Sequence, residues 1–190
     1  MLNNINIAGL SEYTNEVKES SIEGRATYGI ALDWVSGTQT KVKTKNMILG
    51  NHKIVRDFEF TIDEPTQLLG VNHAPNPAEY MLGGLAGCMA VTFMAGATAR
   101  NIEINQLKIE IDGALNLNSF LGIDDTITPG FPELKFIFHV KGNGSQEDYN
   151  TLIERVLKHS PNFNTVKNEV KMIGTLKADS TEAPLVLDKH

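Results

Sequence analysis

The chain has 190 residues, of which 41% are hydrophobic and 21% are charged, as is ordinary for a globular protein with a sizeable core. Its net charge of −6 disfavours binding to nucleic acid or to acidic membranes. One cysteine cannot form an intrachain disulfide, and the first residues lack the basic stretch of a secretory signal. We therefore expect a cytoplasmic protein with one domain, residues 1–190.

The first third of the chain predicts a short helix followed by an antiparallel sheet. Residues 11–19 tolerate a helix with little apolar face, inside an N-terminal extension of residues 1–24. Strand-like segments separated by turn residues then cover residues 26–35, 38–47 and 53–62. We expect these strands to pair in chain order as an antiparallel meander.

The least polar segment, residues 80–99, predicts a long buried helix. Asn76 can cap this helix, with Pro77 at its first position and Glu79 in its first turn, where the helix dipole favours a carboxylate. Twenty uncharged residues could also span a bilayer. The many small residues and the sparse basic flanks favour a helix packed closely against other backbone, so we expect no membrane association.

The remainder of the chain adds strands and a second helix. A capping box from Ser145 to Asp148 predicts the start of that helix. The elements expected after the long helix are a strand (107–113), an apolar loop (118–130), a strand (133–140), the second helix ending at Ser160-Pro161, a strand (170–176) and a loose tail (178–190). The whole pattern predicts an α+β fold in which a long central helix lies against antiparallel sheet.

Cys88, the only cysteine, lies well inside the long helix. A cysteine reacts as the thiolate, which needs a nearby positive group and a path of approach. The helix dipole acts only over the first turn, so a cation would have to come from elsewhere in the fold. At about 100° per residue, Glu79 lies on the opposite side of the helix from Cys88. Taken alone, these residues favour an inert buried cysteine.

Other residue patterns favour no further chemistry. The five histidines are scattered, without the spacing typical of a metal site, so we expect neither a metal ion nor another cofactor. Gly83, Gly84 and Gly87 lie within a helix and not in a phosphate-binding loop. Ser160 follows His159 directly, but no GxSxG motif surrounds it.

Two stretches of sequence carry a family resemblance. They are Pro75-Asn-Pro-Ala-Glu79 with the following Gly-Gly-Leu-Ala-Gly-Cys88, and Phe120-Leu-Gly-Ile-Asp-Asp125 with Pro129-Gly130. Both resemble the OsmC/Ohr family, which comprises osmotically inducible protein C and the organic hydroperoxide resistance protein. The resemblance spans about residues 25–176 and is nearest to the longer OsmC-like branch. It implies an intertwined homodimer, with antiparallel sheets wrapped around central helices and active sites at the subunit interface.

Peroxidase members of this family reduce organic hydroperoxides with two cysteines. The resemblance places Cys88 at the peroxidatic position, where the thiolate attacks the distal peroxide oxygen and becomes a sulfenic acid. Ser160 stands at the position of the resolving cysteine. Because a serine hydroxyl cannot form a disulfide, the standard catalytic cycle cannot close within this chain.

The residues that would activate Cys88 also depart from the family pattern. Ala78 occupies the position of the activating glutamate, and Glu79 follows one residue later. The activating arginine has no clear equivalent. Arg56 is the nearest candidate, with Lys43 and Lys45 as alternatives.

Three functions follow from these observations. In the first, Cys88 is the centre of a one-cysteine peroxidase, and an external thiol reduces its sulfenic acid. In the second, the dimer binds a small apolar molecule without turnover. The pocket for that molecule would be lined by Met89, Phe93, Phe120 and Phe163. In the third, Cys88 or Ser160 acts with His159 in a hydrolase or transferase.

Overall fold

The computed structural model describes residues 1–178 and 181–185, with side chains described for residues 1–177. The elements, in chain order, are η1 (Leu2–Asn4), α1 (Ile7–Glu19), η2 (Ser21–Gly24), β1 (Ala26–Thr27), β2 (Ile30–Ser36), β3 (Gln39–Thr44), β4 (Met47–Leu49), β5 (His52–Ile54), β6 (Glu59–Ile62), η3 (Thr66–Leu68), α2 (Pro77–Ala99), β7 (Ile104–Asp112), α3 (Leu117–Phe120), β8 (Lys135–Gly142), α4 (Gln146–His159), α5 (Pro161–Lys167), β9 (Gly174–Ala178) and β10 (Thr181–Leu185). The predicted α+β class is confirmed.

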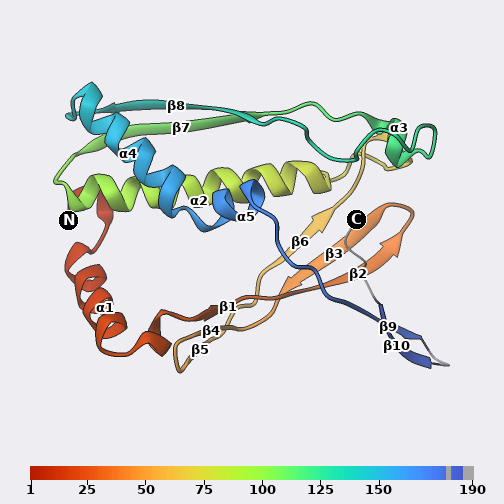
Figure 1. The fold of residues 1–190 in the computed structure, drawn as a ribbon, viewed down its shortest axis with the longest axis horizontal. Coiled ribbons are helices and arrows are strands. Elements are labelled where there is room, and N and C mark those ends of the chain that lie inside the picture. Colours follow the sequence, from red (N-terminus) through yellow and green to blue (C-terminus); the bar gives the residue numbers. More distant parts are fainter. Residues whose placement is uncertain (179–180, 186–190) are drawn as a thin grey trace.

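Helix α2 crosses the molecule and organises the fold around it (Figure 1). Its start confirms the predicted Asn76 cap and adds a capping box that was not predicted: Asn76 Oδ1 accepts from the Glu79 N–H at 2.9 Å, and Glu79 Oε2 accepts from the Asn76 N–H at 2.8 Å. Pro77 occupies the first helical position, where no N–H is required. Asn101 follows the helix with a φ of 59°, a left-handed conformation that ends helical propagation.

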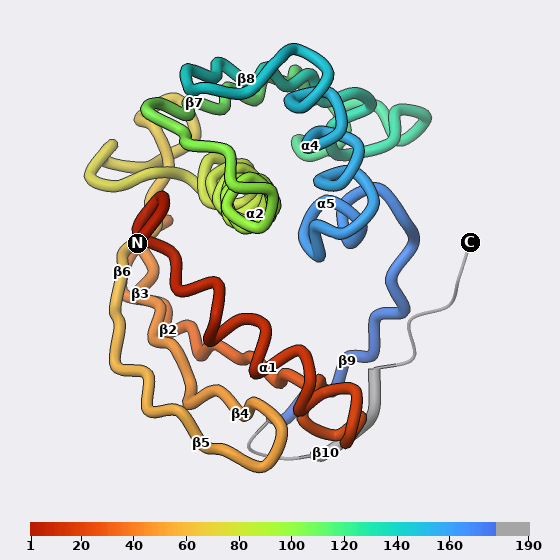
Figure 2. Tube along the Cα trace, turned by 90° about the vertical axis from the view of Figure 1, so that its left-hand side faces the viewer, coloured from red at the N-terminus to blue at the C-terminus, as the bar shows by residue number. Residues whose placement is uncertain are grey.

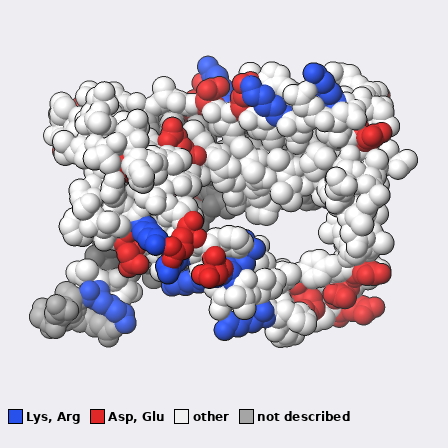
Figure 3. Space-filling model, turned by 180° about the vertical axis from the view of Figure 1, so that it is seen from behind, with Lys and Arg blue, Asp and Glu red and all other residues white. Residues whose placement is uncertain are grey.

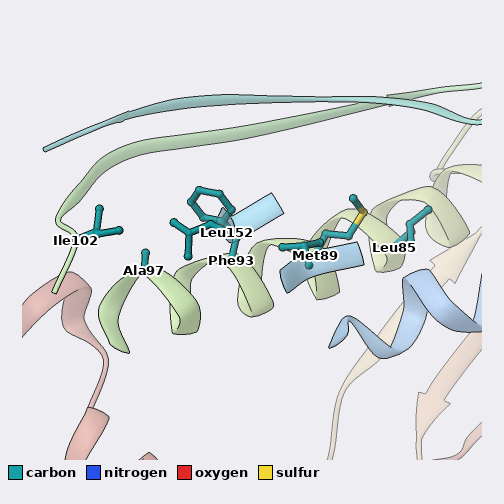
Figure 4. Close-up of a cluster of buried hydrophobic side chains, with 7 residues drawn as sticks. Leu85, Met89, Phe93, Ala97, Ile102 and Leu152 are labelled. Atoms are coloured by element: carbon teal, nitrogen blue, oxygen red, sulfur yellow. The ribbon is translucent and has the colours of Figure 1, made fainter. Parts of the chain in front are cut away.

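The hydrophobic core lies between α2, α4 and the sheet of β7 and β8. Buried side chains recur at every fourth residue of α2 and point toward the two strands (Figure 4). They meet buried residues of α4 and the chain just after α2. The members of this core are Leu85, Met89, Phe93, Ala97, Ile102, Leu152 and Val156. Strands β7 and β8 pair antiparallel over their whole length, and Phe138 places its ring 5.6 Å from that of Phe93.

The N-terminal strands form two small antiparallel sheets, in the orders β2–β3–β6 and β1–β4–β5. The predicted pairing of residues 26–35 with 38–47 is confirmed for β2 and β3, whereas residues 26 and 27 form β1, which pairs with β4. The single strand predicted at 53–62 is wrong. It is divided into β5, which pairs with β4, and β6, which pairs with β3. The N-terminal strands therefore form two sheets instead of one meander. The chain passes from one sheet to the other between β5 and β6.

The N-terminal extension returns to the far end of α2. Asn3 Nδ2 donates to Thr98 Oγ1 at 3.0 Å and to the Ile102 carbonyl at 2.9 Å, and Asn3 Oδ1 accepts from the Ile104 N–H at 2.9 Å. Helix α1 then leads away to the β1–β4–β5 sheet (Figure 2). Residues 1–76 thus form a handle attached to both ends of α2, and Figure 3 shows an opening between the handle and the rest of the molecule.

The C-terminal region is more ordered in the structure than the sequence predicts. Strands β9 and β10 pair antiparallel, from Gly174 opposite Leu185 to Ala178 opposite Thr181. The expected loose tail at 178–190 is therefore wrong for residues 181–185. Residues 179–180 and 186–190 lie outside the described part of the chain.

Within the described residues, α2 is also the one helix long and apolar enough to cross a membrane by length and composition. The core helix of a soluble protein meets the same criteria. Here one face of α2 is covered by the β7–β8 sheet and α4, as expected of such a core helix. The absence of membrane association stays a prediction.

Candidate functional site

Cys88 lies in the middle of α2 and is half-buried, whereas the favoured interpretation expected a buried cysteine. Its Sγ accepts a hydrogen bond from the backbone N–H of Asn162 at 3.5 Å. Asn162 belongs to the first turn of α5, which begins at Pro161. The thiol therefore faces the beginning of another helix, and not the distant N-terminus of its own.

Asn162 is a residue that the sequence analysis did not single out. Its side chain fixes α5 against α2, because Nδ2 donates to the Gly84 carbonyl at 2.9 Å. A Cβ on Gly84 would lie 3.8 Å from that same Nδ2, an ordinary van der Waals distance, so this contact does not itself require glycine. The available signal was Pro161, since proline after a possible cap residue is typical of a helix start.

Ser160, which the sequence analysis predicted to stand at the resolving position, connects α4 to α5 and is fully buried. Its backbone N–H donates to the Val156 carbonyl at 2.9 Å, and its own carbonyl accepts from Asn164 Nδ2 at 2.9 Å. Its Oγ has no hydrogen-bond partner among the described residues. His159 is exposed, so a serine–histidine pair for hydrolysis is not formed.

The predicted activating residues are held by other partners. The Glu79 carboxylate belongs to the α2 capping box, and it lies about 13 Å along the helix axis from Cys88 on the opposite side. Arg56 places its guanidinium 4.6 Å from the ring centre of Phe58 and lines a cavity of about 470 Å³ together with Lys45. Within one chain, the structure therefore does not bring Glu79 or Arg56 to Cys88.

Lys43, the other alternative cation, is engaged in the β2–β3–β6 sheet. Its Nζ lies 2.5 Å from Glu59, and Lys41 lies 2.6 Å from the other oxygen of the same carboxylate. The hydrogen bond and the charge of Glu59 raise the pKa of Lys43. Lys43 therefore keeps its charge and is ion-paired with Glu59, and it is not directed at the thiol of its own chain.

The four apolar residues expected to line a pocket occupy different places. Met89 and Phe93 are fully buried in the core. Phe163 packs edge-on against Phe136, with 6.1 Å between ring centres. Phe120 lies on α3 and is 72% exposed. The described chain does not form the predicted pocket from these residues.

No group of three or more histidine, cysteine, aspartate or glutamate side chains lies together in the described residues as a metal site would require. The charged side chains on β7 and β8 form ion pairs with one another. Glu110 Oε2 lies 2.6 Å from His139 Nε2, and its other oxygen accepts from Lys108. These hydrogen bonds, that from Lys108 first, lower the pKa of Glu110.

Comparison with protein families identifies the chain. The family described as OsmC-like protein matches residues 70–173, which include α2, Cys88, α4 and α5. The chain belongs to the OsmC-like family. The N-terminal extension and the strands β1 to β6 lie outside the matched range. A comparison with curated proteins finds no match.

Several solved structures have a fold similar to that of this chain. An OsmC-like protein from Mycoplasma pneumoniae superposes with a TM-score of 0.58 at 22% identity, covering 74% of this chain and 87% of that one. An OsmC-like protein of unknown function from Vibrio cholerae gives 0.58 at 12% identity, with coverage of 75% and 95%. An organic hydroperoxide resistance protein from Elizabethkingia anophelis gives 0.51 at 21% identity, with coverage of 74% and 88%. At these identities the likeness supports the OsmC-like fold.

Proposed function

We propose that this OsmC-like protein is a cytoplasmic homodimer that reduces small apolar hydroperoxides through Cys88, with an external thiol as reductant. The observation that carries the proposal is the half-buried Cys88 sulfur, which accepts a backbone hydrogen bond from Asn162 at 3.5 Å. Such a donor stabilises negative charge on sulfur, and partial exposure leaves a path for a substrate. Membership of the OsmC-like family adds the expectation of hydroperoxide chemistry.

The reaction divides into an oxidation and two thiol steps. The Cys88 thiolate attacks the distal oxygen of the hydroperoxide, the O–O bond breaks, and the alkoxide takes a proton to leave as an alcohol. Sulfur is thereby oxidised to a sulfenic acid. An external thiol then displaces water and forms a mixed disulfide, and a second thiol releases Cys88 while the two external thiols leave as a disulfide. Ser160 takes no part in this exchange because it has no sulfur.

A homodimer is supported by the surface that one chain exposes. The chain has 14032 Å² of accessible surface, whereas a compact monomer of 20.9 kDa exposes about 9,000 Å². This excess of about 5,000 Å² per chain is larger than the roughly 1,000–2,500 Å² that each subunit of an obligate homodimer buries. Every residue of β2 is exposed, including Ile30, Leu32 and Trp34. We propose that a second copy covers this apolar surface.

The partner would also complete the site. Gly83 and Gly87 lie on the exposed face of α2, and a Cβ on either would meet nothing within 4 Å. A second α2 could therefore approach closely at these residues. In this arrangement the cation that Cys88 lacks within its own chain is supplied across the interface, and Arg56 of the partner subunit is the proposed source.

Intact mass spectrometry of the reduced protein tests the activity. The protein is exposed to near-stoichiometric cumene hydroperoxide in the presence of dimedone, which traps sulfenic acids. We expect a rapid dimedone adduct that is absent from Cys88→Ser, and peroxide consumption that continues when a low-molecular-weight thiol is added. An adduct that forms only at large peroxide excess would instead favour the alternative function, binding of a small molecule without turnover.

Ser160→Cys provides a gain-of-function test of the same site. If Ser160 occupies the resolving position, the new thiol should condense with the Cys88 sulfenic acid, forming an intrachain disulfide and suppressing the dimedone adduct. Val166→Cys, at an exposed residue of α5, is the matched control and should leave the adduct unchanged. A persistent adduct in Ser160→Cys would show that residue 160 does not reach the oxidised sulfur.

A further inference from the structure

The handle and α2 together enclose the opening seen in Figure 3. From the C-terminal end of α2, the handle runs along α1 and through the strands β1 to β6 to the first turn of the same helix (Figure 1, Figure 2). Core side chains of α2 point away from the handle, toward β7 and β8 (Figure 4). Gly83, Gly87 and Val91 each lie two residues from a core residue, which places them on the opposite face of α2, the one that faces the opening.

The N-terminal extension is fixed firmly to the strands of the handle. The Tyr13 hydroxyl of α1 donates to the Glu23 carbonyl, and Asn51 Nδ2 donates to Glu23 Oε1 at 2.9 Å. The Gly50 N–H donates to the Arg25 carbonyl at 2.8 Å. Helix α1 is therefore held in place beside the β1–β4–β5 sheet by both side-chain and backbone hydrogen bonds.

At its other end, the extension depends on one side chain. Among the described residues, all hydrogen bonds between the extension and the chain from α2 onward come from Asn3, which contacts Thr98, Ile102 and Ile104. Asn3 and Asn4 have φ values of 50° and 55°, so two successive left-handed residues turn the chain where Asn3 meets α2. The ring formed by the handle and α2 is thus closed by non-covalent contacts at a single residue.

On the basis of the proposed homodimer, we propose that these Asn3 hydrogen bonds are a latch that closes the handle around α2 of a second copy. A second copy is the occupant that the surface supports, because one chain exposes about 5,000 Å² more than a compact monomer of its mass. In a two-fold symmetric pair, the exposed faces of the two α2 helices meet and each helix lies in the opening of the other subunit. Two chains closed in this way separate only when a latch opens.

The latch has a kinetic consequence that an interface contact does not have. Asn3 and its three partners belong to the same chain, so the latch stabilises the separate subunit and the dimer equally. It is broken only while one subunit passes the other. Weakening the latch should therefore speed association and dissociation by the same factor and leave the dissociation constant of the dimer unchanged.

Subunit exchange measures this effect in the full-length protein. Isotope-labelled and unlabelled protein are mixed, native mass spectrometry follows the appearance of mixed dimers, and sedimentation gives the dissociation constant. Asn3→Ala should exchange subunits about fivefold faster than the wild-type protein, as expected when the hydrogen bonds of one side chain are lost. Asn4→Ala is the matched control, because Asn4 has a similar φ and is exposed, and it should exchange at the wild-type rate.

A second variant and the measured equilibrium decide between the outcomes. Asn3→Asp keeps the shape of the side chain but lacks the Nδ2 donor to Thr98 and Ile102, so it should also exchange faster. Equal rates in the Asn3 and Asn4 variants of a protein that sediments as a dimer would overturn the latch and leave the homodimer standing. A monomer at every concentration would overturn both. A dissociation constant that rises in step with the dissociation rate would make Asn3 an interface contact and would overturn the latch.

Discussion

The two halves of this molecule bury their apolar residues to very different extents. In the helical half (residues 77–167), α2 places Met89 and Phe93 in a closed core with no accessible surface. In the handle (residues 1–76), β2 leaves Leu32 49% and Trp34 71% exposed, although it is no less apolar. Because apolar surface of this extent is unfavourable in water, the difference supports our proposal that a second copy covers the handle, whereas the core of the helical half is closed within one chain.

Truncation of the core tests this difference most strongly. Phe93→Ala removes a fully buried ring that packs on Phe138, and it should lower the free energy of unfolding by about 3–5 kcal/mol. Phe58→Ala, in the handle, removes a ring that is 56% exposed and should cost much less in dilute protein. Denaturant unfolding of both variants measures the two losses. Equal losses at every protein concentration would show that the handle has a packed core of its own.

Asp63 joins two parts of the handle, and its replacement should give the next largest effect. This buried carboxylate accepts from the Thr38 hydroxyl at 2.9 Å, the His73 N–H at 3.0 Å and the Val71 N–H at 3.2 Å. It thereby joins the β2–β3 turn to the loop that leads into α2. Asp63→Asn keeps the shape but replaces one acceptor oxygen with a donor, so we expect a fall of several degrees in the melting temperature at neutral pH.

The same carboxylate makes a pH-dependent prediction. Hydrogen bonds, that from His73 first, hold the pKa of Asp63 at about 2, below its ordinary value of 3.8. A lowered folded-state pKa stabilises the fold above the unfolded value, and this contribution is lost as the pH falls from about 4 toward 2. The difference in stability between the wild-type protein and Asp63→Asn should therefore shrink over this range. A difference that stays constant from pH 7 to pH 2 would contradict this role.

Local sequence signals predicted most of the helical half. The cap at Asn76, the capping box at Ser145 and the alternation of β7 and β8 depend on residues close in sequence, and the structure has all of them. The handle was predicted less well. The division of residues 53–62 between two sheets depends on which distant strand each part meets, and alternation alone does not contain that information.

The candidate site shows the same limit. The position of Cys88 on the long helix follows from sequence, but its hydrogen bond with Asn162 joins residues 74 positions apart. The contact depends on how α4 and α5 turn at Ser160 to approach Gly84. Arg56 was chosen for its residue type, and within the chain it instead lies over Phe58. Nothing local to Cys88 could have shown Asn162 as its partner, whereas Phe58 is only two residues from Arg56.

Asn3 closes the handle, and its replacement should have a modest effect. Asn3→Ala removes the hydrogen bonds to Thr98, Ile102 and Ile104 and should cost about 1 kcal/mol of stability. Hydrogen exchange at the Ile104 amide should also become faster. Asn4→Ala is a matched control, because Asn4 has a similar φ of 55° and is exposed. Equal exchange at Ile104 in the two variants would show that the Asn3 side chain does not hold the handle closed.

Gly87→Ala has the smallest expected effect on stability, but the sign of this effect distinguishes a monomer from the proposed dimer. In a single chain, a Cβ on Gly87 meets nothing within 4 Å, so alanine should stabilise α2 by about 0.8–1 kcal/mol through its higher helix propensity. If a second α2 packs on this face, as we propose, the added methyl group should instead lower the melting temperature and weaken the dimer in sedimentation experiments.

Gly96→Ala is the reference variant for Gly87→Ala, because the side chains that surround Gly96 lie within the same chain. A Cβ there would lie 2.9 Å from Arg155 Cδ and 3.0 Å from Leu152 Cδ2, so alanine should destabilise the helical half in monomer and dimer alike. The proposed dimer predicts that Gly87→Ala resembles Gly96→Ala in sign and differs from it in depending on protein concentration. A gain in stability for Gly87→Ala would show that this face of α2 is exposed to solvent. The glycines would then no longer support a contact between the α2 helices of two subunits.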